Sequence, residues 1–168
     1  MEELIDIYDA DRNRTGKTIP REGAFLKEGE YMLYVLAIVQ DLQDRFLITQ
    51  RSLDKHWAAG WWEVTGGGVL SGETSEQSVV REVREEVGLD VSTQPLEPVY
   101  AYKNVDLERG DNYIVDIYRF RLDVAEDDVT LQDSEAIACK FATWDEICAL
   151  ADEGKFLHFS RLQQALGK

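Results

Sequence analysis

Hydrophobic and polar positions follow two distinct rhythms along this chain, and together they predict both strands and helices. Short apolar or alternating runs rich in β-branched and aromatic residues are typical of strands. We expect strands, in chain order, at 4–8, about 17–19, 31–40, 45–51, 61–64, 98–105, 114–122 and 135–143. The run at 31–40 is almost continuously apolar, which favours a central strand. Polar turns at 41–44 and 108–112 predict two β-hairpins.

Three further segments carry the start and stop signals of helices. Thr74 and Gln77 have the spacing of a capping box, and Gly88 is the expected end of the helix that they begin. Thr143 and Glu146 repeat the same spacing. We expect the remaining two helices from 144 to 151 or 153 and over about 160–166.

The order of these elements limits the fold class. Strands and helices are mixed without the strict alternation of a parallel barrel, which favours an α/β sandwich on a mixed sheet or an α+β fold. The length of 168 residues fits one domain, 1–168. The polar segment 1–30 is interpreted as an N-terminal β extension of that domain.

The first predicted helix has an unusual charge pattern. At about 100° per residue, four valines share one face: Val79, Val80, Val83 and Val87. Glu82, Glu85 and Glu86 fall side by side on the adjoining face, and Arg81 lies one turn before Glu85. Such like charges destabilise a helix by roughly 0.2–0.5 kcal/mol per pair. Either this is a solvated acidic face, or the carboxylates hold a hard divalent ion such as Mg²⁺ or Mn²⁺.

The overall charge makes the grouped carboxylates more informative. The chain has 33 acidic and 18 basic residues, a formal net charge of −15. This argues against nucleic acid or an anionic membrane as a partner, because both are bound by clustered Lys and Arg. The acidic N-terminus does not resemble a secretory signal, and the apolar run 31–39 is shorter than the ~20 residues of a membrane span. With only Cys139 and Cys148 as cysteines, we expect a cytoplasmic protein.

The surroundings of the carboxylates form a long motif. Gly67 is followed after five residues by Glu73, and after seven more by the run R-E-V-R-E-E-V-G-L at 81–89. This stretch, Gly67–Leu89, resembles the Nudix box, G-x5-E-x7-R-E-U-x-E-E-x-G-U with U apolar, at every defined position. The resemblance implies a Nudix hydrolase with an α/β/α sandwich fold on a mixed sheet.

The resemblance also implies a metal site and an activity. Glu82, Glu85 and Glu86 would bind Mg²⁺ or Mn²⁺, with a backbone carbonyl near Gly67. The expected reaction is attack by water on phosphorus in the diphosphate of a nucleoside diphosphate derivative or a related organic pyrophosphate. The metal would make an acidic pocket attractive to this small anionic substrate, polarise the P–O bond and lower the pKa of the attacking water.

Other residues would support the metal site and the proton transfer. The resemblance implies that Glu73 and Arg81 brace the loop and the helix by ion pairing. A carboxylate must take the proton of the attacking water. Either a box glutamate or Glu135 could do so, and Glu135 could equally be an ordinary acid at the edge of a strand.

Gly66, Gly67 and Gly68 are expected to end the strand at 61–64 and to form a tight turn before the first helix. A cluster of aromatic and basic residues precedes these glycines. Arg51 and Lys55 are candidates to hold phosphate, and Trp57 and Trp61 are candidates to stack on a base. Core packing is the alternative for Trp61 or its neighbour Trp62, and a solvated strand end is the alternative for Arg51. Further residues are interpreted as structural or surface positions: His56, His158, Tyr100 and Tyr102.

Two alternative functions stay open within this family. Segments 5–16 and 48–52 also resemble isopentenyl-diphosphate isomerases, which share the Nudix fold. The segment 57–68, however, has no cysteine, and Gly68 stands where those enzymes have a histidine. A non-catalytic binding module usually loses box glutamates, whereas this chain keeps them all. The substrate, the number of metal ions and the formation of a homodimer are left undetermined by the sequence.

Overall fold

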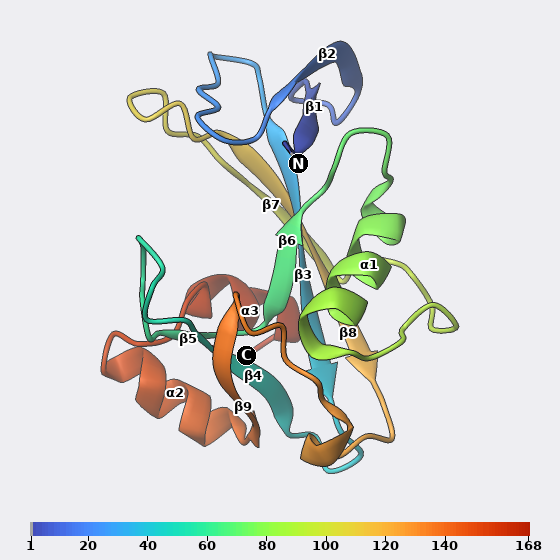
Figure 1. Ribbon diagram of the computed structural model, residues 1–168, viewed down its shortest axis with the longest axis vertical. Helices are drawn as coiled ribbons and strands as arrows, with labels where there is room; N and C mark the ends of the chain where they lie inside the picture. Colours follow the sequence, from blue (N-terminus) through green and yellow to red (C-terminus); the bar gives the residue numbers. More distant parts are fainter. Residues whose placement is uncertain (1) are drawn as a thin grey trace.

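The computed structural model describes residues 2–168, and its elements are arranged as Figure 1 shows. The strands are β1 (Leu4–Tyr8), β2 (Arg14–Pro20), β3 (Met32–Gln40), β4 (Phe46–Arg51), β5 (Trp62–Glu63), β6 (Thr65–Gly68), β7 (Tyr100–Asn104), β8 (Tyr113–Arg121) and β9 (Ala136–Ala142). The helices are α1 (Ser75–Val87), α2 (Trp144–Asp152) and α3 (Phe159–Leu166), with a 3₁₀ turn η1 at Glu126–Asp128. None of the helices in the described residues is long and apolar enough to cross a bilayer.

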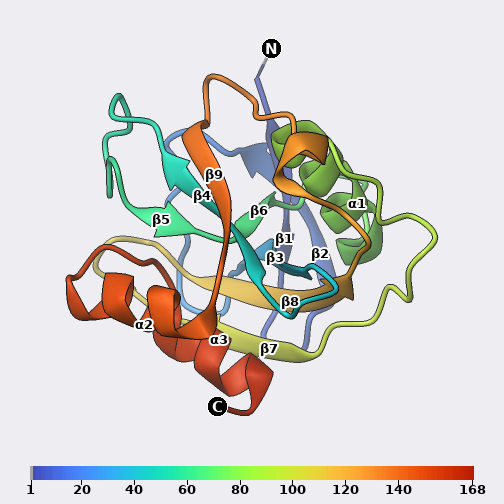
Figure 2. The same cartoon turned by 90° about the horizontal axis from the view of Figure 1, so that it is seen from below.

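A mixed sheet forms the centre of the protein. Its strands run in the order β5-β4-β3-β8-β7, with β6 also paired to β3 and β9 to β4. Strands β3 and β8 are parallel over their whole length, whereas the other neighbours are antiparallel. Figure 2 shows α1 on one side of this sheet and α2 with α3 on the other. The predicted α/β/α sandwich with a mixed sheet is therefore confirmed.

Helix α1 packs its valine face against the sheet as expected. Val79, Val83 and Val87 have no exposed surface, and they share a core cluster with Leu33 and Val35 of β3. Removing these apolar side chains from water is the main force that holds the helix on the sheet. The adjoining edge of α1, which carries Glu82, Glu85 and Glu86, is consequently held in one orientation relative to the sheet.

The glycine segment differs from its prediction. We expected Gly66, Gly67 and Gly68 to end a strand and form a turn, but they belong to β6, which pairs with 34–37 of β3. As a result, the predicted hairpin of β3 with β4 is reduced to one pair, Gln40 with Phe46. The glycines are needed for close approach and not for a turn, since a side chain at Gly66 would overlap the backbone of β3. The second predicted hairpin, β7 with β8, is present.

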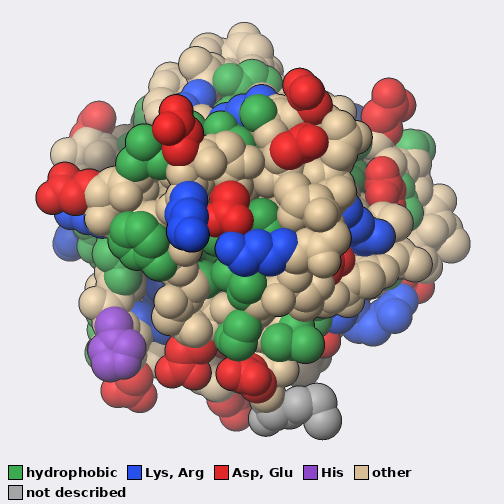
Figure 3. All heavy atoms as spheres, turned by 90° about the horizontal axis from the view of Figure 1, so that it is seen from above, with side chains coloured by type: hydrophobic (Ala, Val, Ile, Leu, Met, Phe, Trp, Pro, Cys, Tyr) green, Lys and Arg blue, Asp and Glu red, His purple; other side chains and the backbone are tan. Residues whose placement is uncertain are grey.

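The N-terminal extension forms its own two-stranded sheet. Strands β1 and β2 are antiparallel, and β2 is longer than the three residues predicted for it. An isolated bridge joins Tyr8 to Tyr31 beside β3, and Arg12 reaches Asp116 of β8 with two hydrogen bonds of 2.7 Å. Seen from this end in Figure 3, acidic and basic side chains are interspersed over the surface. The extension is therefore attached to the central sheet by a backbone bridge and by an ion pair.

Candidate active site

Helix α1 begins and ends where its capping residues predicted. The Thr74 hydroxyl accepts a hydrogen bond from the Gln77 N–H, and the Gln77 side chain accepts one from the Thr74 N–H. Gly88 ends the helix with a φ of 70°, a left-handed conformation that favours glycine. The three carboxylates on its edge differ in exposure, from buried through half-buried to exposed: Glu82, Glu86 and Glu85.

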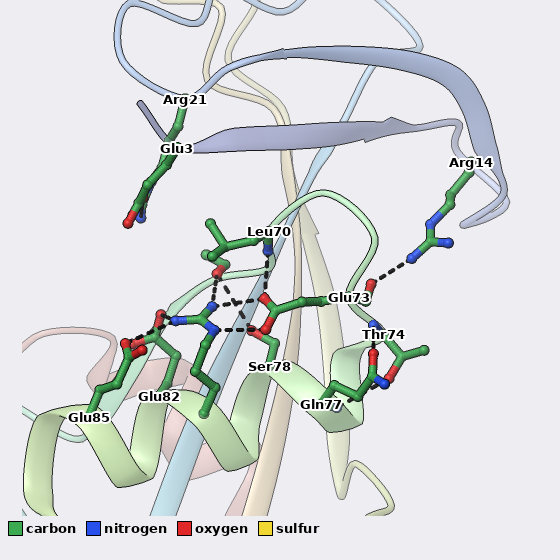
Figure 4. A network of polar contacts seen from close by, with 12 residues as sticks. Glu3, Arg14, Arg21, Leu70, Glu73, Thr74, Gln77, Ser78, Glu82 and Glu85 are labelled. Atoms are coloured by element: carbon green, nitrogen blue, oxygen red, sulfur yellow. Dashed lines mark hydrogen bonds and ion pairs between the residues drawn. The ribbon is translucent and has the colours of Figure 1, made fainter. Parts of the chain in front are cut away.

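Arg81 is the centre of an ion-pair network on this edge. Its guanidinium donates to both oxygens of Glu73, at 2.7 and 2.9 Å, and to the Gly68 carbonyl at 3.0 Å. It also donates to Glu82 at 3.0 Å and to Glu85 at 3.1 Å. Figure 4 shows Glu73, Glu82 and Glu85 converging on it. The loop before α1 and the carboxylates of α1 are thus held by a single side chain.

Glu73 is the fixed partner in this network. Burial acts to raise the pKa of its carboxyl, but hydrogen bonds from Arg81 and from the Leu70 N–H outweigh burial and lower that pKa below its ordinary value. Glu73 therefore stays ionised and ties the loop at 70–73 to the helix. Glu73 and Arg81 thus form an ion pair between the loop and the helix, and their role in bracing a metal site stays a prediction.

Glu82 and Glu86 have the opposite electrostatic character. Burial raises the pKa of Glu86 to about 8, although the Thr65 hydroxyl and the Gly66 N–H donate to its carboxyl. Burial likewise raises the pKa of Glu82 to about 6, against the lowering effect of Arg81. Two neighbouring buried carboxylates without enough positive charge are unfavourable, and each proton bound relieves that cost.

The chemistry of the oxygen donors at this place suits a divalent cation. A Cβ atom at Gly67 would overlap the Glu82 carboxylate, so a side chain at this position would push that oxygen pair away from the β6 backbone. Carboxylate and carbonyl oxygens are the donors that Mg²⁺ and Mn²⁺ prefer. In residues 2–168, no three acidic, histidine or cysteine side chains are grouped closely enough to form a metal cage. Arg81 instead holds Glu82 and Glu85, and Thr65 holds Glu86.

A cavity of about 800 Å³ opens beside these carboxylates, a volume in the usual range for small-molecule sites. The residues predicted for the site that line it are Arg51, Lys55, Trp57, Gly67, Arg81, Glu82, Glu85, Glu86 and Glu135. Glu73 lies behind Arg81 and outside the lining, and Trp61 is also absent from it. The fold therefore brings together the box and most of the residues on the predicted substrate side.

The two predicted phosphate-binding cations are paired with acids. Arg51 donates to Glu63 at 2.9 Å, and its guanidinium lies 5.4 Å from the centroid of the Trp57 ring. Lys55 donates to Glu135 at 2.6 Å. Burial raises the pKa of Glu63 above its ordinary value despite its contact with Arg51. An anionic substrate would have to compete with Glu63 and Glu135 for these cations.

Several cavity residues were not predicted from the sequence. Arg21, which follows β2, lies over Tyr34 with its guanidinium 5.8 Å from the ring centroid, and its acidic partner is Glu3 at 3.0 Å. Figure 4 shows Arg21 and Glu3 above the carboxylates of α1. His158, interpreted as structural or surface, lines the cavity at the start of α3. No local pattern marks these residues, because the extension and α3 reach the site only through the fold.

The raised pKa values predict how stability depends on pH without metal. Glu82 and Glu86 have folded-state pKa values of about 6 and about 8, above the ordinary 4.5. Between pH 4.5 and its folded-state pKa, each carboxyl keeps a proton in the folded protein that it has lost in the unfolded chain. The free energy of unfolding therefore falls as pH rises. Urea denaturation in EDTA should show this loss from about pH 5 to about pH 9.

The matched comparison for this pH effect is Glu86→Gln. The variant should lose less stability than the wild type over the same range, because its amide does not ionise. Parallel stability curves for the two proteins would contradict the raised pKa of Glu86.

Comparison with known proteins places this site in a family. The family model described as NUDIX domain matches residues 30–162. An uncharacterized Nudix hydrolase of Listeria monocytogenes is 33% identical over 165 residues, which are 98% of this chain and 93% of that protein. The chain belongs to the Nudix family. It is a Nudix hydrolase, and its strands β1 and β2 precede the segment 30–162 that the family model matches.

Solved structures similar to this Nudix hydrolase support its fold. The structure of DR0079 from Deinococcus radiodurans has a TM-score of 0.73 and 22% identity, and the match covers 91% of each chain. A bifunctional NMN adenylyltransferase/ADP ribose pyrophosphatase from Francisella tularensis, complexed with AMP and a manganese ion, has a TM-score of 0.65 and 21% identity. That match covers 82% of this chain and 41% of the other.

The likeness to isopentenyl-diphosphate isomerases is local. The enzyme of Klebsiella pneumoniae is 38% identical over 65 residues, which are 38% of this chain and 35% of that enzyme. The predicted resemblance to that branch is therefore present over a limited segment of this Nudix hydrolase.

Proposed function

We propose that this Nudix hydrolase cleaves the diphosphate linkage of a nucleoside diphosphate derivative or a related organic pyrophosphate, with Mg²⁺ or Mn²⁺. The observation that carries the proposal is a single cavity lined both by the carboxylates of Glu82 and Glu86 and by the basic residues Arg21, Arg51 and Lys55. Carboxylates alone would repel a diphosphate, and a site that bound a diphosphate with basic residues alone would have no use for these carboxylates. A site with both fits an anionic substrate that is bound together with a dication.

The carboxylates of Glu82, Glu85 and Glu86, with the carbonyl of Gly67, would hold the metal. When bound, the metal would neutralise phosphate charge and make water a better nucleophile at neutral pH. Arg81 would position this set, because it contacts two of the carboxylates and is itself fixed by Glu73. A divalent cation would also return Glu82 and Glu86 to the ionised form.

The remaining cavity residues would bind the substrate and handle the proton. Arg21, Arg51 and Lys55 would orient the phosphates by charge-assisted hydrogen bonds. Trp57 is 61% exposed at the rim and could cover the substrate from that side. Glu135 and the box glutamates all line the cavity, so either source could accept the proton of the attacking water.

Isomerase chemistry is less well supported by this site. Among the described residues that line the cavity there is no cysteine, and both cysteines of the chain, Cys139 and Cys148, are free thiols elsewhere. Free thiols fit the cytoplasm, where we propose that this enzyme acts. The substrate of the Francisella relative suggests ADP-ribose as one member of a first panel.

The proposal predicts that hydrolysis requires a divalent metal. Purified enzyme should release a phosphorylated product from at least one substrate in a panel of nucleoside diphosphate sugars, ADP-ribose, dinucleoside polyphosphates and nucleoside triphosphates. Product formation, followed by ion-exchange chromatography, should stop in EDTA and return with Mg²⁺ or Mn²⁺. Hydrolysis that continues at full rate in EDTA would refute the proposed chemistry, and conversion of isopentenyl diphosphate without hydrolysis would favour the isomerase.

A further inference from the structure

The cavity extends well beyond the carboxylates, across one face of the sheet. Register places Gly68 of β6, Tyr34 of β3, Val115 of β8 and Tyr102 of β7 in one row of neighbours. Residues paired in this way point to the same face, and so does Tyr113, two residues before Val115. This face lies opposite α1, since Leu33 and Val35 point to the other face of β3 and pack with the valines of α1. Apart from Gly68, the residues of the row and Tyr113 line the cavity. Gly68 has no side chain, and the guanidinium of Arg21 lies over it, 3.2 Å from the place that a Cβ atom would take.

Three tyrosines dominate this part of the cavity, and we call Tyr34, Tyr102 and Tyr113 the tyrosine floor. Tyr34 and Tyr113 meet edge to face with their centroids 5.5 Å apart, and Tyr102 and Tyr113 do so at 6.5 Å. The guanidinium of Arg161, on α3, lies 4.2 Å from the centroid of the Tyr102 ring. These contacts hold the rings in fixed orientations, so the floor is preorganised before any ligand arrives.

The Tyr102 hydroxyl lacks a hydrogen-bond partner. Its oxygen is buried, and it is the one such side-chain atom among the described residues. Burial raises the pKa of this phenol to about 12, so the hydroxyl keeps its proton at physiological pH. A buried hydroxyl without a partner is unfavourable, and natural proteins satisfy most such groups. By contrast, the neighbouring hydroxyl of Tyr100 donates to Gln164 at 2.7 Å.

We propose that the tyrosine floor binds the planar heterocyclic base of the substrate, and that the Tyr102 hydroxyl hydrogen-bonds to that base. The inference rests on the proposed function, because it assigns the part of the substrate that lies beyond the diphosphate. Strands β6 and β7 are three strand spacings apart, about 14 Å. A ligand with phosphates at the carboxylate end and a nucleoside on the floor spans such a distance.

The chemistry of the floor selects among the possible substrate classes. Aromatic rings stack on any base, and stacking improves binding by about tenfold or more per base. A prenyl chain could contact the rings but would leave the Tyr102 hydroxyl unsatisfied, as would any purely apolar group. A base offers ring nitrogens, carbonyls or amino groups to this hydroxyl. The floor therefore favours a nucleoside diphosphate derivative over isopentenyl diphosphate.

Calorimetric titration of the intact enzyme can test the floor separately from catalysis. The probes are AMP, GMP, CMP, UMP and ribose 5-phosphate, each with Mg²⁺ present. At least one mononucleotide should bind about tenfold or more tightly than ribose 5-phosphate. Tyr102→Phe should weaken that mononucleotide by roughly tenfold, the loss of one hydrogen bond, and should leave ribose 5-phosphate unchanged. The control Tyr100→Phe should change neither affinity.

Thermal unfolding of the ligand-free variants separates a binding role from a structural one. Tyr102→Phe should be at least as stable as the wild type, because its hydroxyl has no partner to lose. Equal binding of mononucleotides and ribose 5-phosphate, or an unchanged mononucleotide affinity in Tyr102→Phe, would overturn the inference. Metal-dependent hydrolysis with no preference for a base would overturn the floor but keep the proposed function. Binding that depends on the base, without any hydrolysis, would keep the tyrosine floor but overturn the proposed function.

Discussion

Glu86→Gln should reduce turnover of the best substrate by about 100-fold to 10,000-fold, the equivalent of several kcal/mol of lost transition-state stabilisation. The amide keeps the size of the side chain and can still bond with Thr65, so the fold should survive. What the variant loses is a negatively charged oxygen for the metal beside Thr65 and Gly66 of β6. Steady-state kinetics at saturating Mg²⁺ would measure the loss, and Glu85→Gln should show the same direction of change.

Glu76→Gln is the matched control for this effect. Glu76 lies in the first turn of the same helix but outside the cavity, so the same chemical change should leave turnover within about twofold of the wild type. Circular dichroism should show the same helix content in all of these variants. If Glu85→Gln and Glu86→Gln both keep nearly full activity, these residues are not the principal metal ligands.

Arg12→Ala should lower the free energy of unfolding by about 2 kcal/mol. The Asp116 carboxylate is 1% exposed in the middle of β8, and Arg12 and Ser75 donate hydrogen bonds to it. Breaking a buried ion pair typically costs about 3–5 kcal/mol, because one charge is left uncompensated. The Arg12 side chain is 43% exposed, so water can replace part of its contact and we expect less than the full cost. Urea denaturation would measure the difference.

Lys17→Ala provides the comparison within the same extension. Lys17 pairs with Glu30 at 2.8 Å, but its side chain is 46% exposed, and such pairs contribute less than about 1 kcal/mol. An equal loss of stability in both variants would show that Arg12 does not hold the extension through a buried charge. Because the extension also carries Arg21, Arg12→Ala should raise KM as well.

The sequence by itself determined the elements whose signals are local. The capping box at Thr74 and the glycine at Gly88 set the ends of α1, and valine spacing set its buried face. These features depend on residues within a few positions of one another, so periodicity and capping chemistry are sufficient to predict them. The Nudix box is local in the same sense, and it carried the family and the candidate carboxylates.

Only the tertiary structure decided what surrounds those carboxylates. The glycines became strand β6 because β3 offered an edge for pairing, a partner that lies about thirty residues away along the chain. Arg12 meets Asp116 across 104 residues, and the sheet register gathers Tyr34, Tyr102 and Tyr113 from three strands. Side chains so far apart along the chain meet only when the sheet has formed. Which of them become neighbours depends on the register between the strands, and a local stretch of sequence does not show it.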